Sequence, residues 1–357
     1  MNHKIILCFG LLLYMSISSG IGQEVVTQDS TKKKTKLGPL FKKDELLRFT
    51  LTTHFKPLLR DRSNKKPPYR WAKISYDRKK KSRVAMKIRV KVRGNFRRAT
   101  ANCTFPPLLL NIPNKKDKNT IFERQNLLKL VTHCQNEEYI IQEYLVYQMF
   151  NLLTEHSFQA RLAQVTYEDS AGKRATETRP AFLLENETFL AKRIGATNIY
   201  RKQVPAYLID SVNMATVAVF EYMIGNTDWS VPFLHNIKLF SKNDRIIAVP
   251  YDFDHSGIVE AKYARPAEEL NLESVRQRLY RGLTYSPAVF QEVFDNFRRA
   301  KPAIYALYEE NPQLKEGYVK RTVKYLDAFY KTIDDPKSLK SIFTSTASPP
   351  VVIKGLN

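Results

Sequence analysis

The chain has 357 residues, of which 43% are hydrophobic and 11% aromatic, and it carries a formal net charge of +23. This composition excludes a disordered chain, and the length allows two domains or one two-lobed domain. The excess of Lys and Arg favours polyanionic partners such as nucleotide phosphate, an acidic glycan or an anionic surface, although a solvated basic face is the simpler explanation. We expect no nucleic-acid partner, because the sequence has no zinc-finger spacing, helix-turn-helix pattern or RNA-binding aromatic box.

The N-terminus has the features of a signal peptide, which we predict over residues 1–22. A basic start at Met1–Lys4 precedes the apolar run Ile5–Ile17, and small residues follow it. That run is shorter than the roughly 20 residues that a membrane span needs, which favours a cleaved signal peptide. A retained N-terminal anchor is the alternative. We therefore expect an exported protein, in the periplasm, at the cell surface or secreted, with no transmembrane span in the mature chain. Residues 23–44 are basic and unpatterned and are predicted to be a flexible leader.

Residues 45–186 are predicted to form a β-rich N-terminal lobe with one helix, at Glu137–Thr154. In Arg83–Arg93, apolar residues alternate with basic or small ones, which is typical of a half-buried strand. The other runs that favour strands are Leu46–Leu59, Tyr69–Tyr76, Phe105–Ile112, Leu127–Val131, Ala160–Tyr167 and Pro180–Leu184.

Residues 187–345 are predicted to form a helical C-terminal lobe, and residues 346–357 a tail. This lobe contains a candidate hairpin, Asn236–Phe240 and Arg245–Pro250, joined by a polar turn. Helical periodicity occurs at Ala206–Met223, Leu272–Leu283, Ala288–Arg299, Ala303–Glu310 and Gln313–Ile333. The predicted fold class is α+β, in a two-lobed protein-kinase-like arrangement.

Polar residues around this hairpin occur in the order in which protein kinases carry their phosphoryl-transfer residues. Asp228 is followed by Asn236, then by the hairpin, and then by Asp252 and Asp254 on either side of a phenylalanine. In protein kinases one carboxylate accepts the proton of the attacking hydroxyl, while an Asn and a second Asp hold Mg²⁺ against the phosphates. We predict that Asp228 is catalytic and that Asn236, Asp252 and Asp254 bind Mg²⁺, which prefers oxygen ligands. Structural alternatives for these residues are turn capping and hydrogen bonding to loop backbone.

Lys129 is a charged residue inside the apolar run Leu127–Val131, and Glu143 lies on the helix that follows. Their order matches the strand lysine and helix glutamate of protein kinases, whose ion pair holds the lysine against the phosphates. We predict that both residues contribute to nucleotide binding. The alternatives are an outward-facing strand lysine and a solvated helix face.

Cys103 and Cys134 are the only cysteines outside the predicted signal peptide. In an oxidising compartment they can pair and close a loop of about 30 residues. We predict this disulfide, and two buried free thiols are the alternative.

Together these segments resemble the CotH kinase family of exported or spore-coat atypical kinases, in a divergent Bacteroidetes-type form. The resemblance spans roughly residues 83–260 and is most specific from Asp228 to Asp254. It also includes Arg93-Gly94-Asn95, the Lys129 strand, Glu143-Tyr144-Leu145 and Ala181–Glu185. It implies that Asp228 is catalytic, that Asp252 binds metal, and that Arg93 and Lys129 face the nucleotide phosphates. No Gly-rich phosphate loop is visible in the sequence, and Arg93–Arg98 is the nearest substitute.

The function predicted from the sequence is Mg²⁺- and ATP-dependent transfer of phosphate to a hydroxyl, with Ser or Thr of an exported protein as the expected acceptor. Arg276, Arg278 and Arg281 are candidates to bind an acidic substrate, or form a solvated basic face. One alternative is an inactive kinase-like module that binds an acidic glycan or a partner protein at the cell surface. Another is a HAD-type phosphatase with Asp252 as nucleophile and Asp254 as acid, but the alternating strands and helices which that fold needs do not follow the motif.

Overall fold

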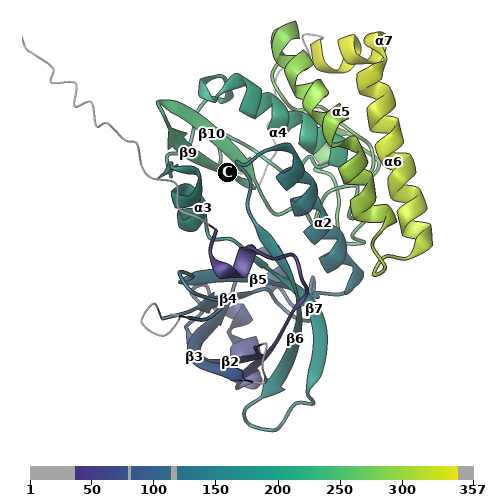
Figure 1. Cartoon of the computed structure of the whole chain (residues 1–357). Coiled ribbons are helices and arrows are strands. Elements are labelled where there is room, and N and C mark those ends of the chain that lie inside the picture. Colours follow the sequence, from purple (N-terminus) through teal and green to yellow (C-terminus); the bar gives the residue numbers. More distant parts are fainter. Residues whose placement is uncertain (1–36, 79–81, 114–118, 345–357) are drawn as a thin grey trace, which may run out of the picture. The chain divides into compact units, whose positions relative to one another are not determined.

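The N-terminal strands close into a barrel (Figure 1). The structure is a computed structural model that describes residues 37–78, 82–113 and 119–344. The strand order around the barrel is β1-β2-β3-β4-β5-β7-β6. These strands are β1 (Leu47–Thr53), β2 (Arg70–Asp77), β3 (Arg83–Val92), β4 (Leu108–Asn111), β5 (Leu127–Thr132), β6 (Ala160–Asp169) and β7 (Glu177–Leu184). The barrel closes at β1, which pairs antiparallel with β2 and parallel with β6.

Apolar side chains fill the inside of the barrel. In β3 the residues Met86, Ile88, Val90 and Val92 are buried, in agreement with the alternation of this segment, because successive side chains of a strand point to opposite faces. The other strands contribute residues such as Leu51, Ile74, Leu108, Leu110, Leu128, Leu130, Val165 and Leu183. The barrel interior is therefore a packed core, and its polar residues face outward or lie at its ends.

The rest of the structure is mainly helical. Helix α2 packs on β6 and β7 and also on α5, so it connects the barrel with the later helices (Figure 1). A separate antiparallel sheet has the order β10-β9-β8. The elements are α1 (Phe55–Arg60), α2 (Glu138–Leu153), α3 (Glu187–Ile194), β8 (Thr197–Ile199), α4 (Ser211–Ile224), β9 (Ile237–Lys242), β10 (Arg245–Pro250), α5 (Pro287–Glu309), α6 (Glu316–Asp334) and α7 (Pro336–Leu339).

The two-lobed protein-kinase-like fold that we expected from the sequence is wrong. A closed seven-stranded barrel of mixed strand directions, a separate sheet and, among the described residues, seven α-helices form a different architecture. The closing pair joins Leu47 to Ala163, which are far apart in the sequence. An alternating pattern identifies the buried face of each strand, but it does not identify the neighbouring strand.

Two helix predictions in the C-terminal part are also wrong. Leu272–Leu283 has no regular helix; its arginine side chains instead donate to backbone carbonyls that are distant in the sequence, those of Met223 and Thr227. The guanidinium of Arg278 donates to the carbonyls of Met223 and Tyr325, so it is committed to structure rather than exposed to a substrate. The helices expected at Ala288–Arg299 and Ala303–Glu310 are one helix, α5, which continues through Pro302.

Some of the predicted segments lie outside the described residues. These are the signal peptide at residues 1–22, most of the leader at residues 23–44 and the tail at residues 346–357. Within the ranges that are described, none of the helices is both long enough and apolar enough to span a membrane.

Candidate functional site

Most of the predicted site residues meet in one cleft, between the loop after β3 and the segments that flank the β9–β10 hairpin. The cleft has a volume of about 310 Å³. The predicted residues that line it are Arg93, Asp228, Asn236, Asp252 and Asp254. Segments that are more than 100 residues apart in the sequence therefore form one site.

The loop that carries Asp228 is fixed by a tight helix end before it and by hydrogen bonds to its backbone. Helix α4 ends at Gly225, whose φ of 67° is a conformation that glycine adopts without strain, and a Cβ there would lie 2.2 Å from the Tyr325 hydroxyl oxygen. The Asp228 backbone N–H donates to Asn226 Oδ1 over 3.0 Å. Arg281 donates to the carbonyls on either side of Asp228, at Thr227 and Trp229. Arg281 therefore positions this loop.

The Asp228 carboxylate is oriented by two side chains of the cleft. Its Oδ1 lies 2.9 Å from His235 Nε2, and its Oδ2 accepts from Asn236 Nδ2 over 3.0 Å. The same Asn236 Nδ2 also lies 2.7 Å from the Asp228 carbonyl oxygen. The side chains of Asp228 and His235 are each 34% exposed, so a ligand in the cleft can reach them. A carboxylate that is oriented and accessible in this way can accept a proton.

Arg97 is the central charge on the opposite wall of the cleft, although no individual role was predicted for it from the sequence. Its side chain is only 7% exposed and forms ion pairs with Glu143 (2.9 Å), Asp252 (2.7 Å) and Asp254 (3.3 Å). Because a buried charge needs a partner, this arginine and the carboxylates stabilise one another. The sequence signal was the run Arg93–Arg98, in which Arg97 does not stand out from its neighbours.

The pKa values in this cluster diverge. Burial raises the pKa of Glu143 to about 8 despite the nearby Arg97. Burial would also raise the pKa of Asp252, but the charges of Arg97, Arg93 and Lys129 outweigh it and hold that pKa below its usual value. Burial therefore favours the neutral form of Glu143, whereas the cations around Asp252 favour its ionised form.

The loop that carries Arg97 is fastened to the barrel by covalent and polar contacts. Cys103 and Cys134 form a disulfide, with their Cα atoms 4.6 Å apart. The guanidinium of Arg62 donates to four carbonyls of the same loop, those of Arg98, Ala99, Cys103 and Thr104. These contacts fix the backbone around Arg97 and so the position of its guanidinium.

Lys129 does not have the partner that we expected. Glu143 is bound by the guanidinium of Arg97, whereas Lys129 Nζ lies over the Tyr251 ring, 4.5 Å from its centre. Burial and the charge of Arg93 lower the pKa of Lys129 to about 7. Lys129 does not itself line the cleft, but it lies against Tyr251, which does, and it interacts electrostatically with Arg93 and Asp252.

The residues predicted to bind metal differ in how available they are. The carboxylate oxygens of Glu143, Asp252 and Asp254 come within 4.8 Å of one another, a spacing compatible with a metal ion. Asp254 is nearly buried, and its Oδ2 accepts from the Tyr263 hydroxyl and also pairs with Arg97. The Asp252 side chain is 37% exposed, and its Oδ1 is the oxygen that contacts Arg97. Asp252 and the amide oxygen of Asn236 therefore fit Mg²⁺ better than Asp254 does.

Three residues that line the cleft have left-handed backbone conformations, Leu234 (φ 53°), Asn236 (φ 51°) and Asp252 (φ 66°). Asn and Asp tolerate this region better than other L-residues do, but a leucine there is strained. Such strain persists only where the surroundings enforce it, and it concentrates at functional sites. Left-handed residues also occur outside the cleft, for example Gln203 and Glu260, so the choice of this cleft rests on its side chains.

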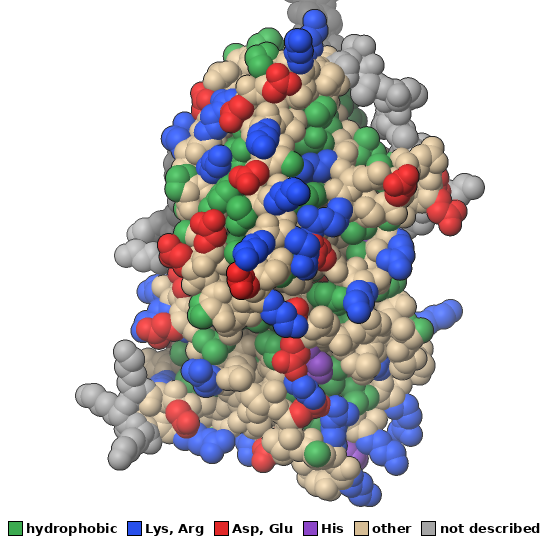
Figure 2. All heavy atoms as spheres, turned by 90° about the vertical axis from the view of Figure 1, so that its right-hand side faces the viewer, with side chains coloured by type: hydrophobic (Ala, Val, Ile, Leu, Met, Phe, Trp, Pro, Cys, Tyr) green, Lys and Arg blue, Asp and Glu red, His purple; other side chains and the backbone are tan. Residues whose placement is uncertain are grey.

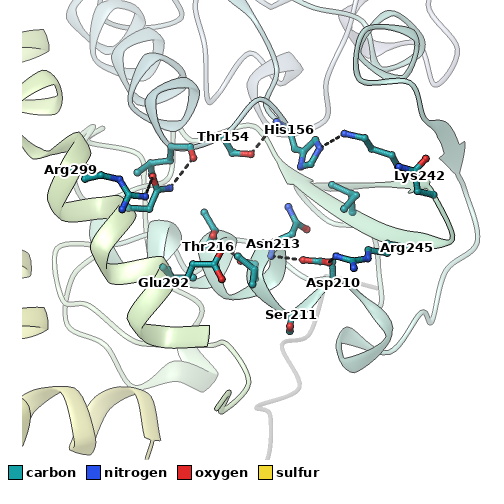
Figure 3. A pocket seen from close by; sticks show the side chains of 16 residues that line it. Thr154, His156, Asp210, Ser211, Asn213, Thr216, Lys242, Arg245, Glu292 and Arg299 are labelled. Atoms are coloured by element: carbon teal, nitrogen blue, oxygen red, sulfur yellow. Dashed lines mark hydrogen bonds and ion pairs between the residues drawn. The ribbon is translucent and has the colours of Figure 1, made fainter. Parts of the chain in front are cut away.

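A larger cavity, of about 890 Å³, lies beside α4, β10 and α5 (Figure 3). Its basic side chains contact other residues of the lining: Lys242 contacts His156, Arg245 contacts Asp210 and Arg299 contacts Asn296. None of the predicted site residues lines it. We therefore place the candidate site in the smaller cleft.

Comparison of the chain with known protein families and with curated proteins finds no match.

Proposed function

We propose that this cleft binds a nucleoside triphosphate with Mg²⁺ and transfers its terminal phosphoryl group to a hydroxyl, as the resemblance to atypical kinases implies. The observation that carries the proposal is the convergence of an accessible carboxylate, two oxygen ligands and cationic side chains in one cleft. The proposal rests on these side chains and not on the fold, because the barrel is unlike a two-lobed kinase. The expected acceptor is a Ser or Thr hydroxyl of an exported protein.

In this reaction the acceptor oxygen bonds to the γ-phosphorus, and the bond from that phosphorus to the bridging oxygen breaks. The proton of the acceptor passes to the Asp228 carboxylate, which His235 and Asn236 hold in place. Arg93 and Lys129 neutralise the phosphate charge, and a phosphate beside Lys129 raises the pKa of that lysine and keeps it protonated. Mg²⁺ bound by Asn236 and Asp252 would supply further positive charge to the leaving diphosphate.

One observation favours a second candidate function, that of an inactive module which binds a ligand without catalysis. The Arg97 guanidinium already lies among the carboxylates of Glu143, Asp252 and Asp254, and it provides the cation that neutralises them. In that case the cleft would recognise an anion through Arg93 and Lys129 and would not require Mg²⁺. Binding and transfer therefore need separate measurements.

The test is calorimetric titration of the purified chain with ATP, with and without MgCl₂, together with an assay of phosphate transferred from labelled ATP to protein or water. The variants are Asp252→Asn and Asp228→Asn. The matched control is Asp244→Asn, because Asp244 is exposed in the turn of the β9–β10 hairpin and does not line the cleft.

We expect Mg²⁺-dependent binding in the wild type and in Asp244→Asn, and its loss in Asp252→Asn. Asp228→Asn should bind ATP but lose transfer by about 10²-fold or more, the order of a general-base contribution. Binding without transfer in the wild type would favour the inactive module. No binding in the wild type, or equal binding in Asp252→Asn, would refute the nucleotide site.

A further inference from the structure

The outer face of the paired strands β2 and β3 carries a row of cations that the proposed reaction does not use. Alternate residues of a strand point to the same face, so the outward positions of β3 are about 7 Å apart. Four of these five positions are basic: Arg83, Lys87, Arg89 and Lys91. Lys73 lies on the neighbouring strand β2 and is also exposed. We call this set of five residues the barrel ribbon.

Within residues 37–78, 82–113 and 119–344, none of the five cations forms an ion pair with a carboxylate. Arg83 donates to the Ser75 hydroxyl, and Arg89 donates to Asn111 Oδ1. Lys73 lies directly opposite Lys87 in the antiparallel register. Two like charges opposite each other on a sheet destabilise it. A ligand that carries negative charge would remove this repulsion.

An aromatic side chain and a shallow hollow lie beside the two lysines. Trp71 is 62% exposed, although a side chain of this size is usually covered. Lys87 Nζ lies 4.2 Å from the centre of the Trp71 ring. The hollow has a volume of about 490 Å³, and its lining includes Trp71, Lys73, Lys87, Met86 and the threonines Thr52 and Thr53. The hollow thus combines an aromatic platform, an apolar floor and two cations, while the Thr52 and Thr53 hydroxyls donate to Glu168 Oε2 and to the Trp71 carbonyl.

The helical face of the structure differs from the barrel ribbon. The side of the molecule in Figure 2, where α5 and α6 lie, has basic and acidic side chains interspersed. Several of them are paired, including Arg298 with Asp295 and Asp334. The unneutralised charge of the barrel ribbon is therefore a local feature and not only a consequence of the net charge of the chain.

We propose that the barrel ribbon and its hollow bind an acidic polysaccharide, with a sugar ring stacked on Trp71 and the carboxylates or sulfates of the polymer on the lysines and arginines. A membrane is less favoured, because Trp71 is the only large exposed apolar residue on this face among the described residues. Single-stranded nucleic acid needs successive exposed rings for its bases, and Tyr69 is half-buried with Arg89 and Lys91 beside its ring. The Cys103–Cys134 disulfide also favours an oxidising compartment over the reducing cytosol.

The test uses the full chain and an oligogalacturonate of defined length as the acidic glycan, with its methyl ester as the uncharged control. Binding is measured by calorimetry at low and at high salt. The variants are Lys73→Gln/Lys87→Gln, which removes the opposed pair, and Trp71→Ala, which removes the platform. The matched control is Lys320→Gln/Lys324→Gln on α6, which removes the same charge from exposed positions elsewhere. Circular dichroism confirms that each variant is folded.

We expect each barrel variant to weaken binding by about tenfold, the effect of losing one good stacking or charge contact. The α6 control and the wild type should bind equally, and binding should weaken as salt increases. The proposal is overturned if the methyl ester binds as well as the acid, or if the α6 control loses as much affinity as the barrel variants. It is also overturned if a single-stranded oligonucleotide or anionic vesicles bind more tightly than the glycan. The outcome is independent of ATP binding, because the barrel ribbon and the candidate site share no residues.

Discussion

Replacing Arg97 with methionine tests the electrostatic account of the cleft most directly. The substitution removes a cation that is 7% exposed and forms ion pairs with three carboxylates at 2.9, 2.7 and 3.3 Å. Removal of one member of a buried ion pair typically costs about 3–5 kcal/mol, because the remaining charge stays buried without a partner. We therefore expect the free energy of unfolding of Arg97→Met to fall by about 4 kcal/mol near pH 7.5.

The measurement is thermal and urea unfolding followed by circular dichroism. With roughly 300 folded residues and an unfolding entropy of about 2 cal/mol/K per residue, this loss corresponds to a decrease in Tm of about 6 °C. The control is Arg98→Met, because Arg98 is half-buried and its guanidinium donates to the Asn64 carbonyl. We expect that control to cost about 1 kcal/mol or less.

The destabilisation should also depend on pH. Burial raises the pKa values of Glu143 and Asp252 and Arg97 opposes this, so without Arg97 we expect both pKa values to be higher in the folded variant than in its unfolded state. The folded variant therefore binds more protons, and its stability falls as pH rises through those values. The difference between wild type and variant should then be larger at pH 8 than at pH 5. A loss no greater than that of Arg98→Met, or a loss that is equal at both pH values, would refute this account of the cluster.

Three further predictions concern stability. The double variant Cys103→Ser/Cys134→Ser opens a loop with a sequence separation of 31. We expect urea unfolding to show that its free energy of unfolding is about 3–4 kcal/mol lower, and that reduction of the wild type has the same effect. Equal stability of the oxidised and reduced chains would contradict this. Burial lowers the pKa of His133 to about 4 from 6.5, so the wild type should lose stability as pH falls through this range. His133→Phe retains a ring that can stack on Phe105. The Tm of this variant should depend less on pH in the acid range than the Tm of the wild type does. An unchanged dependence would count against the prediction. Burial raises the pKa of Glu221 to about 8 from 4.5, so the wild type should lose stability as pH rises through this range. Glu221→Gln should make the dependence of Tm on pH flatter between these values. An unchanged dependence would show that Glu221 does not cause it.

Part of the candidate site could be predicted because its residues are close in sequence. Asp228, Asn236 and Asp252 flank one hairpin, and the turn Asn243-Asp244 has the positive φ angles that favour a tight connection between adjacent strands. Once that hairpin forms, the Tyr251 N–H donates to the Asn236 carbonyl, which brings the segments before and after it together. The grouping of these three residues therefore follows from local structure.

The partners of Glu143 and Lys129 could not be predicted in the same way. Glu143 binds Arg97, which is 46 residues away in the sequence, and Asp252 binds the same arginine across 155 residues. Neither contact leaves a local pattern, because an arginine in a basic run has the same sequence signature whether it is buried or solvated. By contrast, His235 is only seven residues from Asp228 and adjacent to Asn236, so its contact with Asp228 belongs to the local group.

Local sequence patterns were enough to predict the strand or helix character of most segments, the apolar face of β3 and the cluster of polar residues around the β9–β10 hairpin. These features depend on residue types at short spacing. The closure of the strands into a barrel and the place of Arg97 at the centre of the acidic cluster became known from the three-dimensional structure alone. The tertiary structure also decided that Leu272–Leu283 is not helical, because Arg278 and Arg281 bind the backbone of distant segments. These outcomes depend on the burial of charge and on long-range strand pairing, which bring together residues that are distant in the sequence.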